Sequence, residues 1–232
     1  MNALNSPECR PTLSVVIPTL NAASGIAATL MSLQGEAHDI IVVDGGSSDA
    51  TVSIAQSLGA TVLRSERGRG HQLIAGAHLA RGDWLLFLHG DTRLAANWPD
   101  HAAAFTADPA NTDRAAVFTF SLDDESPQAR RLESFVMWRT RLLGLPYGDQ
   151  GLLMSRRLYD LLGGYSPLPL MEDVDLVRRI GRNRLYILPV AAVTSAERWR
   201  RDGWMRRSLR NVACLALYMM GVSPRVIARL YG

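Results

Sequence analysis

Short apolar runs alternate with amphipathic segments along the first half of the chain. The apolar runs have the length of buried strands and cover residues 13–17, 40–43, 61–63 and 84–88. The segments between them have the apolar spacing of helices, at residues 25–33, 50–58 and 70–80. Asp49 is placed to cap the second helix and Gly59 to end it. Strands that are separated by single helices predict a parallel sheet with right-handed crossovers.

The second half alternates less regularly. Further strands are predicted at residues 115–120, 151–154 and 185–188. Helices are predicted at residues 97–107, 128–143, 156–162, 173–180, 204–220 and 223–230. No internal repeat and no low-complexity linker interrupts the pattern. We therefore expect an α/β fold, with one domain over residues 1–232 and C-terminal helices from about residue 200.

Composition narrows the class of protein. No apolar run in the 232 residues reaches the roughly 18 residues of a membrane span. The first eleven residues are polar and unlike a signal peptide. The two cysteines, Cys9 and Cys214, lie far apart and form no metal-binding spacing, which favours a reducing compartment. We expect a cytoplasmic protein.

The net charge of +3 hides an uneven distribution. Residues 1–125 hold 7 Arg and 14 acids, whereas residues 126–232 hold 18 Arg and 8 acids. The basic half suggests an anionic partner such as lipid phosphate, and no motif favours nucleic acid. Residues 128–143 and 204–220 carry large apolar residues beside arginines, so they suit the inner face of a membrane and a lipid-linked acceptor. The alternatives are core helices or the face of a homodimer.

Two of the strands end in acids. The strand at 40–43 leads into Asp44, followed by Gly45-Gly46-Ser47-Ser48-Asp49, and the strand at 84–88 leads into His89-Gly90-Asp91. Ligands of open α/β sheets bind beyond the carboxyl ends of strands. Asp91 suits Mg²⁺ or Mn²⁺ on a diphosphate, and His89 is either a second ligand, a donor to phosphate or a histidine bonded to backbone. Asp44 can accept a hydrogen bond from a pyrimidine N–H, and Gly45 permits close approach of a ligand.

Other motifs are less specific. Pro18 ends the first strand and exposes Thr19 and Asn21, which suit a ribose or a base edge but also fit an ordinary turn. Glu172-Asp173 opens a helix, where an acid is either a cap or a general base. The dinucleotide fingerprint is absent, and without any Lys the chain has no P-loop.

Together these segments resemble the family 2 glycosyltransferases. The ordered matches between about residues 13 and 180 are Val16-Ile-Pro-Thr-Leu-Asn21, Ile41-Val-Val-Asp-Gly-Gly-Ser-Ser-Asp49, Gly76-Ala77, Ala80-Arg-Gly-Asp83, Phe87-Leu-His-Gly-Asp91, Tyr147-Gly-Asp-Gln-Gly151, Gly163-Gly-Tyr165 and Met171-Glu-Asp173. The chain looks most like a small soluble bacterial branch that is sometimes associated with arsenosugar biosynthesis.

The resemblance implies the GT-A fold, a Rossmann-like, mostly parallel sheet flanked by helices. It implies a nucleotide-binding half over about residues 12–93 and an acceptor half over about residues 94–190. The residues that it assigns to the donor are Pro18, Thr19, Asn21, Asp44, Gly45, Arg69, Gln72, His89 and Gly90. Asp91, the last acid of a D-x-D motif, would hold Mg²⁺ or Mn²⁺ on the diphosphate, and Asp173 would be the base of an inverting displacement.

Three positions depart from the family's pattern. His89 replaces the first acid of D-x-D, which leaves the choice of metal open. Ile74 stands where the branch has Asn. The chain reads Ser195-Ala-Glu-Arg198-Trp199 where processive synthases carry Q-x-x-R-W, and this favours transfer of a single sugar.

The resemblance therefore predicts an inverting, metal-dependent glycosyltransferase that uses a nucleotide sugar, expected to be UDP-linked, and a hydroxyl acceptor. One alternative is a GT-A-like module that binds a nucleotide sugar but is catalytically impaired. Another is a sugar nucleotidyltransferase, although such enzymes need an early Gly-rich loop with a basic residue, which residues 13–25 lack.

Overall fold

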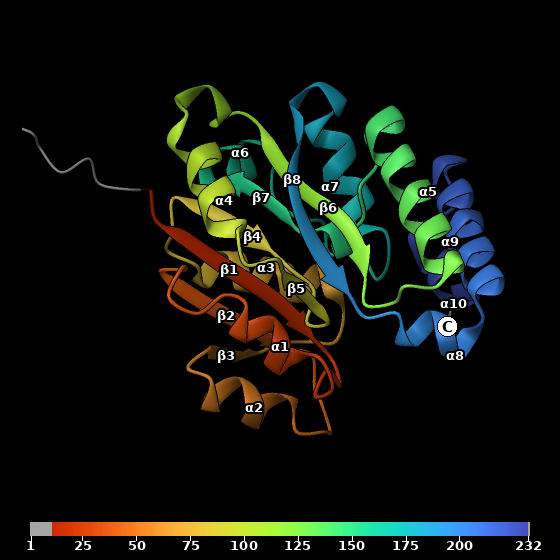
Figure 1. Cartoon of the computed structure of the whole chain (residues 1–232), viewed down its shortest axis with the longest axis horizontal. Coiled ribbons are helices and arrows are strands. Elements are labelled where there is room, and N and C mark those ends of the chain that lie inside the picture. Colours follow the sequence, from red (N-terminus) through yellow and green to blue (C-terminus); the bar gives the residue numbers. More distant parts are fainter. Residues whose placement is uncertain (1–10, 232) are drawn as a thin grey trace, which may run out of the picture.

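The computed structural model describes residues 11–231, so Cys9 lies outside the described residues. Its strands form one eight-stranded sheet in the order β3-β2-β1-β4-β7-β6-β8-β5 (Figure 1). The first four strands are parallel, as predicted: β1 (Leu13–Thr19), β2 (Asp39–Asp44), β3 (Thr61–Arg64) and β4 (Trp84–Phe87). The helices between them are α1 (Ile26–Met31), α2 (Thr51–Ser57) and α3 (Arg69–Leu79).

The remaining strands extend the same sheet beyond β4, with both parallel and antiparallel pairings. They are β5 (Thr92–Leu94), β6 (Ala115–Leu122), β7 (Leu152–Ser155) and β8 (Leu185–Thr194). β7 pairs antiparallel with both β4 and β6, β8 is parallel to β6, and β5 pairs antiparallel with β8 at the edge. The helices of this half are α4 (Trp98–Ala107), α5 (Pro127–Leu143), α6 (Arg156–Leu161), α7 (Glu172–Ile180), α8 (Glu197–Asp202), α9 (Trp204–Met219) and α10 (Pro224–Tyr231). Short 3-10 turns lie at Pro109–Asn111, Gly148–Gln150 and Arg182–Arg184.

The structure corrects several sequence predictions. The strand predicted at residues 185–188 continues to Thr194. Pro189 does not end it, because Pro189 lies where the β6–β8 register shifts, and a residue at such an irregularity does not have to donate a backbone hydrogen bond to the neighbouring strand. β5 and α8 were not predicted. The N-cap of α2 is Ala50 and not Asp49, whose carboxylate instead accepts bonds from Thr51. Gly59 does end this helix, with φ of +83°.

Alternating strand residues fill two apolar layers. Val15 and Ile17 face the layer that α1, α2 and α4 cover, whereas Val16 faces the layer that α3, α6 and α7 cover. This double cover explains why the central strands read as continuous apolar runs. It leaves only the strand ends and the loops beyond them for polar side chains.

Helices α5, α8, α9 and α10 lie together beyond one end of the sheet (Figure 1), and α8, α9 and α10 form the expected C-terminal helical extension. Leu132 of α5 and Trp204 of α9 pack on one apolar cluster with Trp199 of α8. Cys214 of α9 and Ile227 of α10 belong to a second cluster, with Leu145. Within residues 11–231, no helix combines the length and apolar character needed to cross a bilayer.

Candidate active site

The carboxyl ends of β1 and β4 border one large cleft. The cleft has a volume of about 610 Å³ and continues to the loop that follows β8 and to α8. The predicted site residues that line it are Pro18, Thr19, Asn21, Arg69, Gln72, His89, Gly90 and Asp91. Asp44 and Gly45 do not line it.

Asn21 joins the loops that follow β1 and β2. Its φ of +50° is uncommon for a residue other than glycine. Its Oδ1 accepts a bond from the backbone N–H of Ser48 at 2.9 Å, and its own N–H donates to Ser47 Oγ at 2.8 Å. The backbone conformation of Asn21 is therefore fixed by two bonds to the neighbouring loop.

Asp44 is buried and bonded within its own turn. Its Oδ2 accepts bonds from the backbone N–H groups of Gly46 and Ser47 at 3.0 and 2.9 Å, and Ser47 Oγ bonds to Oδ1. The carboxylate thus shapes the loop beside the cleft, and its contact with a nucleobase remains a prediction.

Gln72 of α3 ties two strand ends together. Its Nε2 donates to the carbonyls of Thr19 and Val43, both at 2.7 Å. A Cβ on Gly45 would lie 3.1 Å from this nitrogen, so a glycine there allows the side-chain amide to approach. Gln72 fixes the floor of the cleft at the point where β1 and β2 end.

Asp91 lies where the cleft meets α8. A Cβ on Gly25 would lie 3.0 Å from Asp91 Cα, so the two loops are closely packed. Arg198 Nη2 lies 3.5 Å from Asp91 Oδ2, a longer separation than that of a strong charged hydrogen bond. The sequence shows Arg198 only as part of a departure from Q-x-x-R-W, whereas the structure brings it to Asp91 through the loop after β8.

The imidazole of His89 is held neutral near the same point. Burial, aided by the Arg69 guanidinium, lowers the pKa of His89 to about 4. A Cβ on Gly148 would lie only 2.5 Å from His89 Nε2, so no other residue fits at Gly148 without moving the ring. His89 can therefore offer a lone pair to a cation or an N–H to an anion.

A smaller cavity of about 110 Å³ adjoins the large cleft. Arg69, His89, Asp91 and Arg198 border both spaces. Asp173 lines only the smaller one, with Tyr147, Asp149, Leu170, Met171, Thr194, Trp199, Arg207 and Asn211. The structure thus brings Asp91 and Asp173 to one cavity from opposite halves of the chain.

Asp173 lies in the first turn of α7. Met171, just before this helix, has φ of +67°, an uncommon backbone conformation for a residue with a side chain. Asp173 Oδ2 accepts the Gly148 N–H at 2.9 Å and Oδ1 accepts the Val174 N–H at 2.8 Å. These bonds hold the carboxylate in a fixed orientation at the cavity wall.

Glu172 is 1 % exposed and lines neither cavity. Its Oε1 lies 2.7 Å from Arg69 Nε, which joins the N-termini of α3 and α7 across the cleft. Burial raises the pKa of the Glu172 carboxyl, and Arg69 limits that rise. In the predicted Glu172-Asp173 pair, one carboxylate is therefore paired with an arginine and the other faces the cavity.

Asp149 lines the smaller cavity, and the sequence pattern does not single it out although it lies in the matched Tyr147–Gly151 motif. Burial, with further contributions from the nearby Asp173 and Asp91 carboxylates, raises its pKa to about 6. Its Oδ1 is buried and has no hydrogen-bond partner. A carboxyl in this state needs a proton, a cation or a ligand hydroxyl beside it.

The C-terminal helices add more unpaired polar atoms to the smaller cavity. Trp199 Nε1, Arg207 Nε and Asn211 Oδ1 are buried without a partner. Arg207 Nη1 bonds Asp202 at 2.7 Å, and its guanidinium lies 5.0 Å from the Trp199 ring. Two donors and one acceptor on α8 and α9 can thus bind a polar group that enters this cavity.

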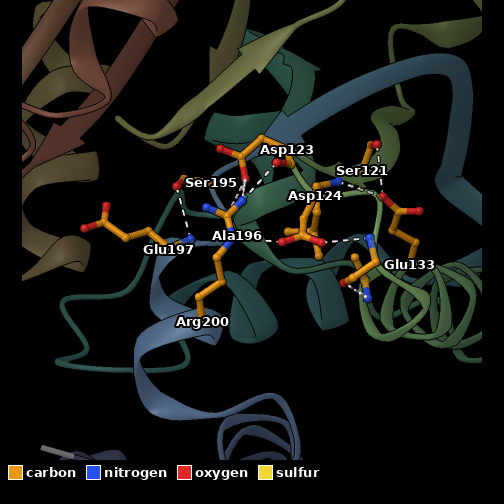
Figure 2. Close-up of polar contacts among 11 residues, drawn as sticks. Ser121, Asp123, Asp124, Glu133, Ser195, Ala196, Glu197 and Arg200 are labelled. Atoms are coloured by element: carbon orange, nitrogen blue, oxygen red, sulfur yellow. Dashed lines mark hydrogen bonds and ion pairs between the residues drawn. The ribbon is translucent and has the colours of Figure 1, made fainter.

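Arg200 fixes α8 beside the site (Figure 2). Its Nε bonds Asp124 Oδ2 at 2.8 Å and its Nη2 bonds Asp123 Oδ1 at 3.2 Å. The Ala196 N–H donates to the same Asp123 oxygen at 2.6 Å. The loop after β6 therefore sets the position of the helix that carries Arg198 and Trp199.

The residues present fit a divalent cation only together with a bound phosphate. Among the described residues, no group of three His, Cys, Asp or Glu forms a metal cage. Asp91 offers one carboxylate at the cleft, and His89 lies in the same short loop. Mg²⁺ and Mn²⁺ are commonly bound by one or two carboxylates plus substrate phosphates, and this arrangement suits that mode.

Comparison with known proteins identifies related sequences. Residues 14–160, more than half of the chain, match the sequence model described as Glycosyl transferase family 2. A PGL/p-HBAD biosynthesis glycosyltransferase of Mycobacterium tuberculosis is 36 % identical over 94 residues, which are 36 % of this chain and 37 % of that protein. The chain thus matches well under half the length of this relative.

Solved structures share the fold at low sequence identity. A mannosyltransferase of Pyrobaculum calidifontis, in complex with GDP-Man and Mn²⁺, has a TM-score of 0.62 and 22 % identity over 81 % of this chain and 57 % of that one. The glucosyl-3-phosphoglycerate synthase of Mycobacterium tuberculosis, in complex with Mn²⁺, UDP and glucosyl-3-phosphoglycerate, has a TM-score of 0.55 and 21 % identity over 78 % of this chain and 70 % of that one.

Proposed function

The chain belongs to glycosyl transferase family 2, and on this basis we propose that it moves one sugar from a UDP-linked donor to an acceptor hydroxyl with inversion at the anomeric carbon. The fold is that of the GT-A glycosyltransferases. The observation that carries the proposal is that Asp91 and Asp173, from opposite halves of the chain, border one cavity of about 110 Å³.

In this proposal the nucleotide occupies the large cleft and its sugar the smaller cavity. Pro18, Thr19 and Asn21 lie along the cleft at the nucleoside end, and Arg69 lies where the two spaces meet. The half over residues 12–93 would bind the donor, and the half over residues 94–190, with α8 and α9, would bind the acceptor. The unpaired atoms of Trp199, Arg207 and Asn211 favour an acceptor group that is rich in hydroxyls.

Asp173 would act as the base. Its carboxylate takes the proton from the acceptor hydroxyl as that oxygen bonds to the anomeric carbon. The bond from this carbon to the diphosphate oxygen breaks at the same time, and its electron pair leaves with the nucleoside diphosphate. Each Asp173 oxygen already accepts one backbone N–H, which orients the carboxylate and leaves a lone pair for the substrate proton.

Two arginines lie beside the position proposed for the leaving group. Arg69 and Arg198 border both spaces, so their guanidinium groups can stabilise the charge that builds up on the departing diphosphate. Mg²⁺ or Mn²⁺, held by Asp91 and substrate phosphate, would supply further charge stabilisation when bound. The solved neighbours described with Mn²⁺ support a divalent cation, and those with UDP or GDP-Man support a nucleotide donor.

Two substitutions separate the proposed roles. Asp173→Asn should lower transfer by about 100-fold or more while changing the UDP dissociation constant by less than about twofold. Asp91→Asn should weaken Mn²⁺-dependent UDP binding by about tenfold. Isothermal titration with UDP, in Mn²⁺ or in EDTA, measures binding. Release of UDP from a panel of UDP-sugars, with and without added acceptors, measures turnover.

Asp113→Asn, at an exposed carboxylate outside both cavities, is the matched control and should change neither quantity. An equal loss of binding and turnover in Asp173→Asn would refute its role as base. UDP binding without turnover of any donor would instead identify a catalytically impaired binding module, an outcome that His89 in place of the first D-x-D acid makes worth testing.

A further inference from the structure

The outer faces of the C-terminal helices are apolar. On α9 the exposed positions Met205, Leu209, Val212, Ala216 and Met219 recur at helical spacing, so they form one stripe. Met205 is 73 % and Leu209 is 62 % exposed. With a rise of about 1.5 Å per residue, the stripe is about 21 Å long. Single exposed apolar residues are ordinary, but a continuous stripe of this length indicates an interaction surface.

Helix α5 repeats this feature beside α9. Phe135, Trp138 and Leu142 are exposed at helical spacing, and the Phe135 and Trp138 rings stack with centroids 5.9 Å apart. Leu132 of α5 and Trp204 of α9 pack against the same cluster, so the two helices are neighbours. On α10, Val226 and Leu230 are also exposed.

The charge around these stripes has one sign. From Gly203 to the end of the chain there are five arginines and no acid. Arg206, Arg225 and Arg229 are exposed beside the apolar positions of α9 and α10, and Arg131 and Arg141 are exposed on α5. The acid of α5, Glu133, is bonded to Arg130 and to the end of β6.

We propose that the outer faces of α5, α9 and α10 bind peripherally to an anionic lipid surface. Amphipathic helices with apolar residues on one face and arginines beside them lie in the plane of a bilayer interface. Anionic head groups complement the arginines, and the apolar stripe enters the acyl boundary. Because α9 is too short and too charged to span a membrane, the contact lies on the bilayer surface.

The same charges argue against a second copy of the chain as the occupant. In a two-fold symmetric dimer each patch meets itself, so arginines would face arginines with no acid from α9 or α10 between them. Like charges placed across an interface disfavour association. An anionic surface matches both the apolar and the charged residues.

The proposal is independent of the proposed transferase activity, because its test uses no sugar nucleotide. The full chain is sedimented with vesicles of about 30 % phosphatidylglycerol in phosphatidylcholine, and with pure phosphatidylcholine, at about 50 mM and about 500 mM NaCl. We expect binding to the phosphatidylglycerol vesicles at low salt, at least tenfold weaker binding at high salt, and none to phosphatidylcholine.

Variants then separate the two contributions. Met205→Gln/Leu209→Gln removes apolar contact and should lower vesicle binding at least tenfold at low salt. Arg206→Gln/Arg225→Gln/Arg229→Gln should lower it by roughly fivefold per arginine. Arg157→Gln/Leu161→Gln changes an equally exposed pair on α6 and should leave binding unchanged. Thermal melts check that all variants are folded.

The proposal is overturned if the wild-type chain does not bind phosphatidylglycerol vesicles, or if the α6 variant loses as much binding as the α9 variant. It is also overturned if velocity sedimentation without lipid shows a dimer that Met205→Gln/Leu209→Gln dissociates, because that result assigns the surface to a second copy.

Discussion

At the scale of single residues, the site combines carboxylates with different surroundings. Asp173 is oriented by two backbone N–H groups, Glu172 is paired with Arg69, and Asp149 has an unpaired buried oxygen. Asp91 faces the cleft beside Arg198. Groups of the same chemical type thus have environments that suit separate tasks.

Asp149 should make stability depend on pH. Its pKa is raised from an ordinary 3.8 to about 6, so between these values the folded chain holds more protons than the unfolded chain, and stability falls as pH rises. Asp149→Asn removes the unfavourable ionisation of this buried carboxyl. It should raise the free energy of unfolding by about 1–3 kcal/mol at pH 8, and by less at pH 4.5. Urea unfolding in EDTA at both pH values measures the difference.

Asp160→Asn, at an exposed carboxylate on α6, provides the comparison and should change the free energy of unfolding only slightly. An advantage of Asp149→Asn that is larger at pH 4.5 would contradict the direction of the pKa shift.

The ion pair between Arg69 and Glu172 should stabilise the fold, and removing one of the two charges should cost more free energy of unfolding than removing both. Arg69→Gln leaves the Glu172 carboxylate buried without this partner and should lower the free energy of unfolding by about 1–3 kcal/mol. This is less than for a fully buried pair, because the Arg69 side chain is 36 % exposed and solvent screens its charge. Arg69→Gln/Glu172→Gln should recover part of that loss, since no buried charge remains. A double-mutant cycle of unfolding free energies tests this, and strict additivity of the two changes would refute the coupling.

Sequence could locate Asp91 and Asp173 because each lies at the end of a local signal, a buried strand or a helix start. The loop after β8 is different, because its approach to Asp91 depends on the pairing of β8 with β5 and β6. Arg198 and Trp199 therefore could not be placed at the site from local pattern. Asp149 was within reach, since its motif had been matched, but its burial depends on contacts made by the whole fold.

At the scale of elements, close packing of α3 positions the segment that leads to Asp173. A Cβ on Gly70 would lie 2.5 Å from the Ser166 carbonyl oxygen and 2.8 Å from the Leu168 nitrogen, both backbone atoms. The first turn of α3 thus sets the path of the segment that leads to Asp173. Helix propensity alone would favour alanine at Gly70, so the glycine reflects this contact.

Gly70→Ala should therefore destabilise the chain by about 1–3 kcal/mol, despite the better helix former, and should lower turnover more than nucleotide binding. His78→Ala, on the exposed side of the same helix, raises propensity without touching the loop and is the control. Chemical unfolding and the UDP-release assay measure both effects. An unchanged free energy of unfolding in Gly70→Ala would show that the backbone at Ser166 and Leu168 can shift without destabilising the fold.

The elements also show where sequence pattern stops being informative. Apolar runs predicted the central strands well because both faces of the sheet are covered. β5 has only three residues, and its middle one, Arg93, is exposed, so it carries no strand signal. α8 has one buried residue, Trp199, among charged ones, and its position comes from Arg200 and the loop after β6.

At the scale of the whole molecule, the two cavities proposed to bind the donor are lined by residues from Pro18 to Asn211, so a ligand there should stabilise the entire fold. UDP with Mn²⁺ at about 100 times its dissociation constant should add about 2.7 kcal/mol, or about 5–10 °C in melting temperature. Thermal shift with UDP and Mn²⁺, compared with UDP and EDTA, measures this effect. A shift that is equal in EDTA would show that the metal makes no contribution to nucleotide binding.

The order of strands in the sheet also has a consequence for how the chain is made. β4 lies in the middle of the sheet, yet its neighbour β7 begins 65 residues after β4 ends, and Thr92 of β5 meets a residue 102 positions later in the chain. While a ribosome is still translating the second half, the edge of β4 therefore stays open to other nascent chains. Such long-range pairing slows folding, so the yield of native protein in a cell should depend on chaperones that shield this edge until translation is complete.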